Sequence, residues 1–373
     1  MKSSSDDYLV TLDTDPVAAI DCWARELGPA PLIGPFQSTQ WLQAWYDTLG
    51  ATNDVQPLLV SIRRRDDGRL QMGLPLLIRQ GGGLRRIEFA DRGVTDYAAP
   101  LLTMAPPTSD QMRAMYAALR RALPRADLLV LHKCASSLAG VPNPLLALRG
   151  MRRSTLRGHV AHFGEDFDAW RRRCDKRHRK GMERCWRVFN RHPGAAFQVA
   201  ADPHDALQIL QTLEAQQRAV ATRKGWAYLL DQPAHRHFYR RLVDGGLDDG
   251  SVVLSTLTAE GQVIAVALGI RQGDYYALLR VTHAGDRWRH CSPGRLLIDR
   301  TMAAMHAHGV RRFDLTIGDY AYKQAYLPTP VPLYELEQAL SWRGMPFIAY
   351  RRVRRWLAPF ARRLCRPKAV PEH

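Results

Sequence analysis

The sequence predicts a mixed α/β (α+β) protein made of two copies of one unit, each a mixed, largely antiparallel sheet flanked by helices. The order helix, hairpin, strand, helix, strand occurs once before residue 133 and again after residue 166. The length of 373 residues suits two domains rather than one. Hydrophobic residues make up 46% of the chain and charged residues 24%, which are the proportions of a folded protein.

The N-terminal copy begins with a helix that Ser38 caps, in the sequence STQWLQAWYDTLG, and we expect this helix to end at Gly50. The apolar runs PLLVSIRRR and LQMGLPLLI flank Asp67-Gly68, a pair typical of a hairpin turn. The remaining elements of this copy are predicted to be a strand, a helix and a strand at residues 86–89, 109–121 and 127–132.

The C-terminal copy begins with a basic amphipathic helix over residues 167–190. Helices follow at 204–222 and 235–244. The segment SVVLSTLTAEGQVIAVALGI is predicted to be a hairpin that turns at Glu260-Gly261. The strand DYYALLRVTH, a helix that starts at Ser292 and the strand RRFDLTIG complete the copy.

Prolines and glycines in residues 141–164 favour a connection between the two copies. We therefore predict an N-terminal domain at 1–164, a C-terminal domain at 165–342 and a basic tail at 343–373. The start, MKSSSDDYLV, lacks the pattern of a secretory signal, and no apolar run approaches the ~18 residues of a membrane span. Six scattered cysteines without a CxxC pair suit free thiols. We expect a cytoplasmic protein.

The net charge of +17 comes from two segments. Residues 171–191 contain ten Lys or Arg against two acidic residues, and residues 343–368 contain nine Lys or Arg and no acidic residue. Such local basic surfaces indicate anionic partners at defined places: phosphate groups, a membrane surface or RNA.

Within the tail, apolar residues in 346–364 recur at alternating intervals of three and four residues, with arginines between them. This spacing predicts an amphipathic helix. The apolar positions are Tyr350, Val353, Leu357, Phe360 and Leu364. Pro359 is expected to kink or divide this helix. The helix either lies on an anionic membrane, at its inner face, or docks on the sheet with its arginines in water.

The turn that opens the helix after Cys291 indicates an anion site. Ser292 is a preferred capping residue, Pro293 suits the first turn, and Gly294 permits close approach of the backbone. Three free N–H groups, the helix dipole and Arg295 would hold a phosphate group there. The alternative is an ordinary capped helix without a ligand.

This turn, followed about twenty residues later by FDLTIGDYAYK, resembles the acyltransferase domain named for the cellulose-biosynthesis protein CelD. That family belongs to the GNAT superfamily and is related to the FemAB aminoacyltransferases. The matching residues are Ser292, Pro293, Gly294, Leu297, Phe313, Asp314, Gly318, Asp319, Tyr322 and Lys323. Leu315 stands where the family commonly has an aromatic residue. The likeness extends over residues 36–326.

The resemblance implies tandem GNAT-like domains and direct transfer of an acyl group from a coenzyme A thioester to an amine or hydroxyl, without a metal. The acceptor would be a small molecule or glycan, such as a sugar or surface-polysaccharide precursor. The N-terminal copy would be degenerate and shape the acceptor cleft. Acyl-CoA would be bound by the C-terminal copy through Ser292, Pro293, Gly294, Arg295 and Leu296.

Acyl transfer requires a base for the acceptor, a donor for the oxyanion and a proton for the leaving thiolate. Lys323 is the candidate for the oxyanion or a coenzyme phosphate, and Tyr322 for the thiolate. Alternatively, Tyr322 packs in the core and Lys323 pairs with Asp319. Asp314 lies in an apolar strand, where it is either a base of raised pKa or a partner that orients Arg or Lys side chains.

His283 and Glu214 are further candidates for the base, although a lone histidine at a strand end is commonly structural. Cys291 precedes a helix, which can lower the pKa of a thiol. The pairs His235/His237 and His306/His308 are two residues apart on helices and do not converge on a metal.

Two other functions compete with acyl transfer from coenzyme A. One is FemAB-like transfer from aminoacyl-tRNA, in which the basic helix at 171–191 would contact RNA. The other is a non-catalytic scaffold for polysaccharide assembly. The intact turn at 292–294 and the Tyr322-Lys323 pair favour an enzyme, and we expect no nucleic-acid partner.

Overall fold

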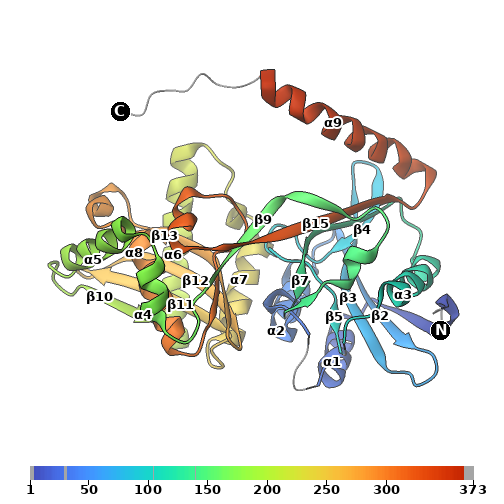
Figure 1. The fold of residues 1–373 in the computed structure, drawn as a ribbon, viewed down its shortest axis with the longest axis horizontal. Coiled ribbons are helices and arrows are strands. Elements are labelled where there is room, and N and C mark those ends of the chain that lie inside the picture. The colour runs from blue at the N-terminus through green and yellow to red at the C-terminus, as the bar shows by residue number, and fades with distance from the viewer. Residues whose placement is uncertain (1–3, 29–31, 104, 139, 365–373) are drawn as a thin grey trace.

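The computed structural model describes residues 4–28, 32–103, 105–138 and 140–364, with side chains described as far as 357. One mixed sheet runs across the whole molecule (Figure 1). Its strand order is β1-β2-β3-β4-β6-β15-β9-β14-β13-β12-β11-β10, and β5 pairs with β3 beside this path. Helices flank the sheet, and most neighbouring strands are antiparallel, which confirms the predicted fold class.

The sheet contains the same four-stranded unit twice. In each unit three antiparallel strands precede a helix that crosses over to a fourth strand, parallel to the third. The N-terminal unit comprises β2 (Val55–Arg64), β3 (Leu70–Gly81), β4 (Leu84–Phe89), α3 (Ser109–Ala122) and β6 (Leu128–Ala135). The C-terminal unit comprises β11 (Val252–Ala259), β12 (Gln262–Gln272), β13 (Tyr275–His283), α8 (Pro293–Ala307) and β14 (Arg312–Asp314).

Shorter strands extend or flank these units. They are β1 (Tyr8–Asp13), β5 (Leu101–Leu102), β7 (Ser137–Leu138), β8 (Val141–Pro142) and β10 (Ala196–Val199). The predicted turn at Glu260-Gly261 is confirmed, since both residues have positive φ between β11 and β12.

Two long strands exchange between the units at the middle of the sheet (Figure 1). β9 (Arg152–His162) follows the N-terminal unit but pairs with β14, and β15 (Thr329–Ala339) follows the C-terminal unit but pairs with β6. β9 and β15 also pair with each other. The segment 141–164, which was predicted to connect the two copies, therefore also contains a long strand of the sheet that was not predicted. The strand was not predicted because its many arginines suggest an exposed loop. Their acidic partners lie far along the chain, as in the Arg152–Glu337 pair.

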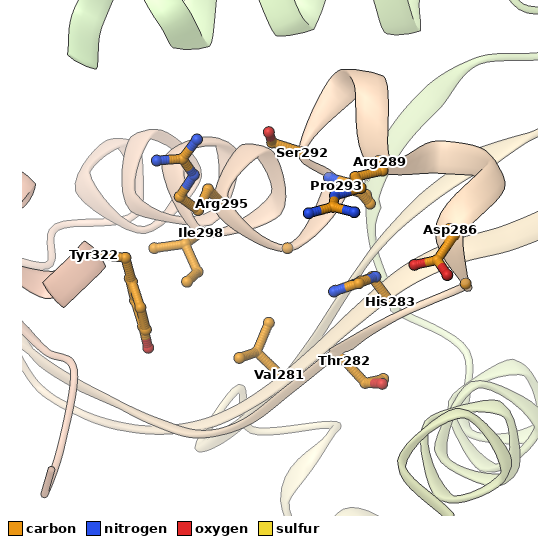
Figure 2. Close-up of a pocket in the computed structure, with 12 residues that line it drawn as sticks. Val281, Thr282, His283, Asp286, Arg289, Ser292, Pro293, Arg295, Ile298 and Tyr322 are labelled. Atoms are coloured by element: carbon orange, nitrogen blue, oxygen red, sulfur yellow. The ribbon is translucent and has the colours of Figure 1, made fainter. Parts of the chain in front are cut away.

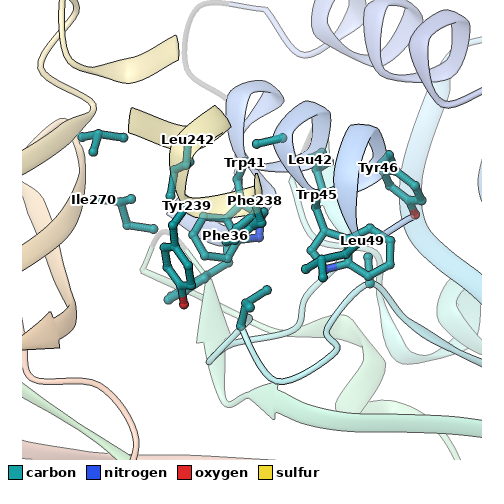
Figure 3. Packing of buried hydrophobic residues seen from close by; sticks show 14 of the residues in the cluster. Phe36, Trp41, Leu42, Trp45, Tyr46, Leu49, Phe238, Tyr239, Leu242 and Ile270 are labelled. Atoms are coloured by element: carbon teal, nitrogen blue, oxygen red, sulfur yellow. The ribbon is translucent and has the colours of Figure 1, made fainter. Parts of the chain in front are cut away.

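Two helices join the units on one face of the sheet. α2 (Thr39–Thr48) packs against α7 (Pro233–Gly246), with the rings of Trp41 and Phe238 4.9 Å apart in an edge-to-face contact (Figure 3). Ser38 accepts a hydrogen bond from the Trp41 N–H, as the predicted helix cap requires. α1 (Pro16–Glu26) and α6 (Pro203–Lys224) flank this pair.

The predicted helix over 167–190 is two helices, α4 (Phe167–Arg173) and α5 (Lys176–Phe189). They separate because Asp175 adopts a non-helical conformation and caps α5 by accepting from the His178 N–H. α9 (Met345–Leu364) is assigned as one helix through Pro359, so the proline does not divide it. Among the described residues, no helix combines the length and the apolarity that a bilayer crossing requires.

Candidate functional site

A wedge opens where β13 and β14 part. These parallel strands pair only over Tyr275–Ala277 and Arg312–Asp314. The next residue, Leu315, donates its N–H to the carbonyl of His159 in β9 at 2.8 Å. The chain after β14 therefore stays beside β9 while β13 continues away from it, which leaves a gap between the two arms.

A β-bulge turns the β13 arm toward this gap. Leu268 of β12 lies opposite Arg280, whereas the next residue, Gly269, lies opposite Leu278. Leu279 is thus an extra residue on β13. Bulges re-aim side chains and are common beside functional sites. Here Leu279, Arg280 and Val281 are all half-buried rather than alternating between the two faces.

The first cavity, which we call the α8 cavity, has a volume of about 380 Å³ (Figure 2). It lies between the end of β13, the 3-10 helix η5 (Asp286–Cys291) and the first turn of α8. Its lining residues are Val281, Thr282, His283, Gly285, Asp286, Arg289, Ser292, Pro293, Gly294, Arg295, Ile298 and Tyr322.

The start of α8 offers two free N–H donors rather than the predicted three. Pro293 has no N–H, and the Leu296 N–H bonds to the Ser292 carbonyl at 3.0 Å. For the N–H groups of Gly294 and Arg295, the described residues provide no recorded acceptor. Ser292 precedes the helix in a left-handed conformation, with φ of 48°, and its side chain caps nothing. The free donors and the helix dipole favour an anion there.

Two arginines against one carboxylate, that of Asp286, make the α8 cavity positive. Arg289 and Arg295 both line it, and no carboxylate partner is recorded for either in the described part of the chain. His283 also lines it and its Nδ1 lies 2.8 Å from the Ala284 carbonyl oxygen. The side chain of Leu296 lies instead in the apolar core, so of the five residues predicted to bind the acyl donor it alone does not reach this space.

The second cavity, which we call the wedge cavity, has a volume of about 450 Å³ and receives residues from both units. It shares Val281 and Tyr322 with the α8 cavity, so the two spaces adjoin. Its lining residues are Gly93, Val94, Asp96, Gln217, Tyr239, Leu278, Leu279, Arg280, Val281, Leu315, Thr316, Ile317, Tyr320, Tyr322 and Lys323.

Lys323 lies in the 3-10 helix η6 (Ala321–Tyr326) and is buried at the wall of the wedge cavity. Its Nζ donates to the carbonyls of Thr316 at 2.9 Å and Ile317 at 3.0 Å. Burial lowers the pKa of Lys323 to about 8. The alternative pairing with Asp319 is not formed, because Asp319 accepts from Arg157 at 2.7 Å and lies 2.9 Å from the His159 ring nitrogen.

Tyr322 lines both cavities, and Figure 2 shows it at the wall of the α8 cavity. Its ring stacks on Tyr320, with centroids 6.1 Å apart, and its side chain is half-buried. Burial raises the pKa of the Tyr322 hydroxyl, which therefore carries its proton at neutral pH. Because Tyr322 lines both cavities, its hydroxyl is a candidate proton donor where they adjoin.

Asp314 is fully buried and lines neither cavity. Its carboxylate accepts from the hydroxyls of Tyr97, at 3.0 Å, and Tyr275, and from the Thr316 N–H at 2.6 Å. Burial raises the pKa of Asp314 to about 6. Of the two predicted alternatives, the raised pKa is present, whereas the hydrogen-bond partners are these neutral groups and not an Arg or Lys side chain. Through these hydrogen bonds the Asp314 side chain holds together the residues at the point where β13 and β14 separate.

Asp96 is the residue that sequence reasoning missed. It lies in a loop of the N-terminal unit and lines the wedge cavity together with Lys323 and Thr316. Burial raises the pKa of Asp96, against the opposing effects of the Lys133 charge and a hydrogen bond with Thr316. Thr316 itself has φ of 60°, a strained conformation for a β-branched residue. Nothing in the surrounding sequence, DRGVTDYAAP, distinguishes Asp96 from an ordinary loop aspartate.

Arg280 is a second missed residue. Its guanidinium lies over the ring of Tyr239, 4.5 Å from the centroid, and donates to the amide oxygen of Gln217 at 2.7 Å. In the ranges that the structure describes, no carboxylate is recorded within ion-pair distance of it. The wedge cavity therefore holds a fixed, oriented cation from β13.

Two predicted candidates lie outside both cavities. Glu214 of α6 is nearly buried, 3.6 Å from Arg236, and burial raises its pKa. Cys291 is fully buried, and burial raises the pKa of its thiol instead of lowering it. The described residues also contain no group of three or more His, Cys, Asp or Glu that could hold a metal ion.

Comparison with known protein families gives a match in the C-terminal part of the chain. The family model described as "Acetyltransferase (GNAT) domain" matches residues 176–324, the stretch that contains α8 and most of both cavity linings. This match indicates a transferase domain of the GNAT type. A search of curated protein sequences finds no match.

Solved structures share the fold over nearly the whole chain. FemX is 12% identical with a TM-score of 0.60, and the match covers 89% of this chain and 98% of FemX. The C-terminal domain of a putative lysylphosphatidylglycerol synthetase from Agrobacterium fabrum is 12% identical with a TM-score of 0.51, over 91% and 97% of the two chains. L-PGS from Bacillus licheniformis is 12% identical with a TM-score of 0.50, over 87% and 91%. At these identities the likeness concerns the fold.

Proposed function

We propose that this chain is an acyltransferase that takes an acyl group from a coenzyme A thioester and passes it to an amine or hydroxyl. The observation that carries the proposal is the junction of the two cavities at Val281 and Tyr322. One cavity offers donors for phosphate, and the other offers acid and base groups. A transferase needs both spaces to meet at the reacting atoms.

The α8 cavity is the site for the coenzyme. The N–H groups of Gly294 and Arg295 are free, and the guanidinium groups of Arg289 and Arg295 have no recorded carboxylate partner in the described chain. Helix starts of this kind hold pyrophosphate in other nucleotide-binding folds. The thioester end would then reach the wedge between β13 and β14, beside Tyr322.

The wedge cavity is the site for the acceptor. In this proposal Asp96 accepts the proton that the acceptor loses, since its raised pKa makes it a stronger base than an exposed aspartate. Tyr322 donates a proton to the leaving sulfur. Lys323 holds the chain after β14 in place through the carbonyls of Thr316 and Ile317. A sugar or surface-polysaccharide precursor, as in CelD-type enzymes, is the acceptor class that we propose.

Transfer from aminoacyl-tRNA is the second candidate function. The basic helix α5 packs against both α8 and η5, at the border of the α8 cavity. Exposed Lys176 and Arg177 in its first turn could contact a nucleic-acid donor. The same wedge would then serve an aminoacyl ester instead of a thioester.

Titration of the full-length protein with coenzyme A, acetyl-CoA and tRNA, read by thermal shift and calorimetry, distinguishes these donors. We expect coenzyme A to bind and raise Tm, and tRNA effects to vanish at moderate salt. A tRNA shift that survives salt, without any coenzyme effect, would establish the second function.

Gly294→Val tests the location of the coenzyme site. A Cβ at Gly294 would lie 3.3 Å from Cδ2 of His283, and the further carbons of valine would extend among the lining residues. We expect at least about tenfold weaker coenzyme binding. Gly81→Val is the matched control, because a Cβ at Gly81, at the end of β3, would meet no atom within 4 Å. Equal affinity in the two variants would place the coenzyme elsewhere.

A further inference from the structure

α9 is fixed to the protein through one side only. Arg351 and Arg355 donate to the buried carboxylate of Glu337 in β15, at 2.7 Å and 3.0 Å. On the same side, Ile348 is buried and Phe347 is partly buried against the outer face of the N-terminal unit. The inward arginines therefore serve as an anchor, which neither sequence interpretation of the tail anticipated.

The other side of α9 exposes large apolar groups. The exposed fractions are 64% for Met345, 60% for Tyr350, 55% for Val353 and 69% for Trp356, and Leu357 is exposed beside them. At about 100° per residue, these positions form one continuous arc of roughly 140° around the helix. An exposed apolar surface of this extent marks a docking site for a protein or a membrane. Figure 1 shows α9 along the outer edge of the molecule.

Basic residues border the apolar arc on both sides. Arg352 lies at one edge and Arg354 at the other, and both are exposed. The sequence from 343 to 368 contains no acidic residue that could neutralise them. An apolar strip between two positive edges matches the surface of an anionic bilayer, where acyl chains lie beneath lipid phosphates. A second copy of the chain fits poorly, because two such strips face to face would bring like charges together.

We propose that α9 lies in the surface of an anionic lipid bilayer, with its apolar arc inserted and with Arg352 and Arg354 against lipid phosphates. The Glu337 anchor then fixes the orientation of the sheet relative to the membrane. This proposal is independent of the transfer chemistry, because none of the α9 side chains that the structure describes, 345–357, lines either cavity at the site.

Cosedimentation of the full-length protein with vesicles tests it. One set of vesicles contains phosphatidylglycerol with phosphatidylcholine, and the other contains phosphatidylcholine alone. We expect binding to the anionic vesicles to exceed binding to the neutral ones by at least about tenfold, and high salt to release part of the protein. Equal binding to both sets, or binding to neither, overturns the proposal.

Substitutions locate the surface. Val353→Asp should reduce anionic-vesicle binding by at least about tenfold, since it places a charge within the apolar arc. Val17→Asp in α1 is the matched control, because Val17 is 57% exposed and far from α9 in sequence. Arg352→Glu with Arg354→Glu should also release the protein while leaving its Tm unchanged. If Val353→Asp only converts a dimer to a monomer in light scattering and leaves vesicle binding intact, the surface is a self-association site and the proposal fails.

Discussion

Replacing Asp314 with asparagine should change how the stability of this protein depends on pH. Asp314 is fully buried behind the wedge, and burial raises the pKa of its carboxyl from 3.8 to about 6. A carboxyl whose pKa is raised by folding stabilises the folded state only while it is protonated. This contribution is complete below pH 3.8 and is lost as pH rises through about 6.

The magnitude follows from the two pKa values. A rise from 3.8 to about 6 corresponds to about 3 kcal/mol of folding free energy at neutral pH. The wild-type protein should therefore lose about 3 kcal/mol relative to Asp314→Asn between pH 3 and pH 7. The variant can still hydrogen-bond to Tyr97 or Tyr275 through its amide oxygen, so we expect it to fold.

Urea unfolding of both proteins at several pH values measures this difference. Asp319→Asn is the control of opposite sign, because the hydrogen bond from Arg157 lowers the pKa of Asp319 to about 2. Asp319 therefore stabilises the fold above its unfolded pKa, and this stabilisation disappears as pH falls toward 2. Parallel curves for wild type and Asp314→Asn would refute the claim that burial dominates the ionisation of Asp314.

Four further substitutions test the site and the anchor. Asp96→Asn should lower kcat about 100-fold and remove the acidic limb of the pH–rate profile, while coenzyme binding measured by calorimetry stays unchanged. Tyr322→Phe should lower kcat most for thioesters whose leaving thiol has a high pKa, which a series of thiol analogues measures. Lys323→Ala should lower turnover at least about tenfold, or about 1.4 kcal/mol of transition-state stabilisation, because the chain after β14 loses two hydrogen bonds. Glu337→Gln should expose Arg351 and Arg355 to trypsin, which limited proteolysis followed by mass spectrometry detects.

These outcomes separate chemistry from folding. Unchanged kcat in Asp96→Asn would exclude Asp96 as the base. His283, which lines the α8 cavity, would then be the candidate base. A uniform loss across all thiols in Tyr322→Phe would indicate packing rather than proton donation. If Glu337→Gln is cleaved no faster than wild type, then Phe347 and Ile348 hold α9 without the ion pairs.

Local patterns in the sequence predicted the repeated unit because its elements depend on neighbours along the chain. The caps, turns and apolar runs of β11, β12 and α8 are all readable within a few residues. β9 was missed because its stability depends on pairing with β14 and β15, which lie 150 or more residues later. Its arginines suggest a solvated loop when only the sequence is known. In the fold they form ion pairs with Glu335, Glu337 and Asp319.

The site shows the same division. Ser292, Gly294, Arg295 and Tyr322 form a recognisable motif, and the structure places all four around the α8 cavity. Asp96 reaches the wedge from the other unit, so no spacing rule could have linked it to Lys323. Arg280 was passed over because a strand arginine is ordinary, and only the bulge at Leu279 turns it toward the cavity.

The exchange of β9 and β15 explains why two units are needed for one site. The wedge exists because the chain at Leu315 stays hydrogen-bonded to β9 instead of to β13. β9 itself precedes the C-terminal unit in the chain. The predicted domain boundary at 164/165, which stays a prediction, falls just after β9. A fragment that starts at residue 165 would keep the α8 turn but lose β9, Tyr97 and Asp96 together. Such a fragment could retain the donors for phosphate, yet it would have neither the strand that opens the wedge nor the proposed base. The N-terminal unit therefore contributes to the proposed chemistry by supplying Asp96 to the wedge cavity. Its own helix α3 is not preceded by a turn like the one at 292–294 before α8.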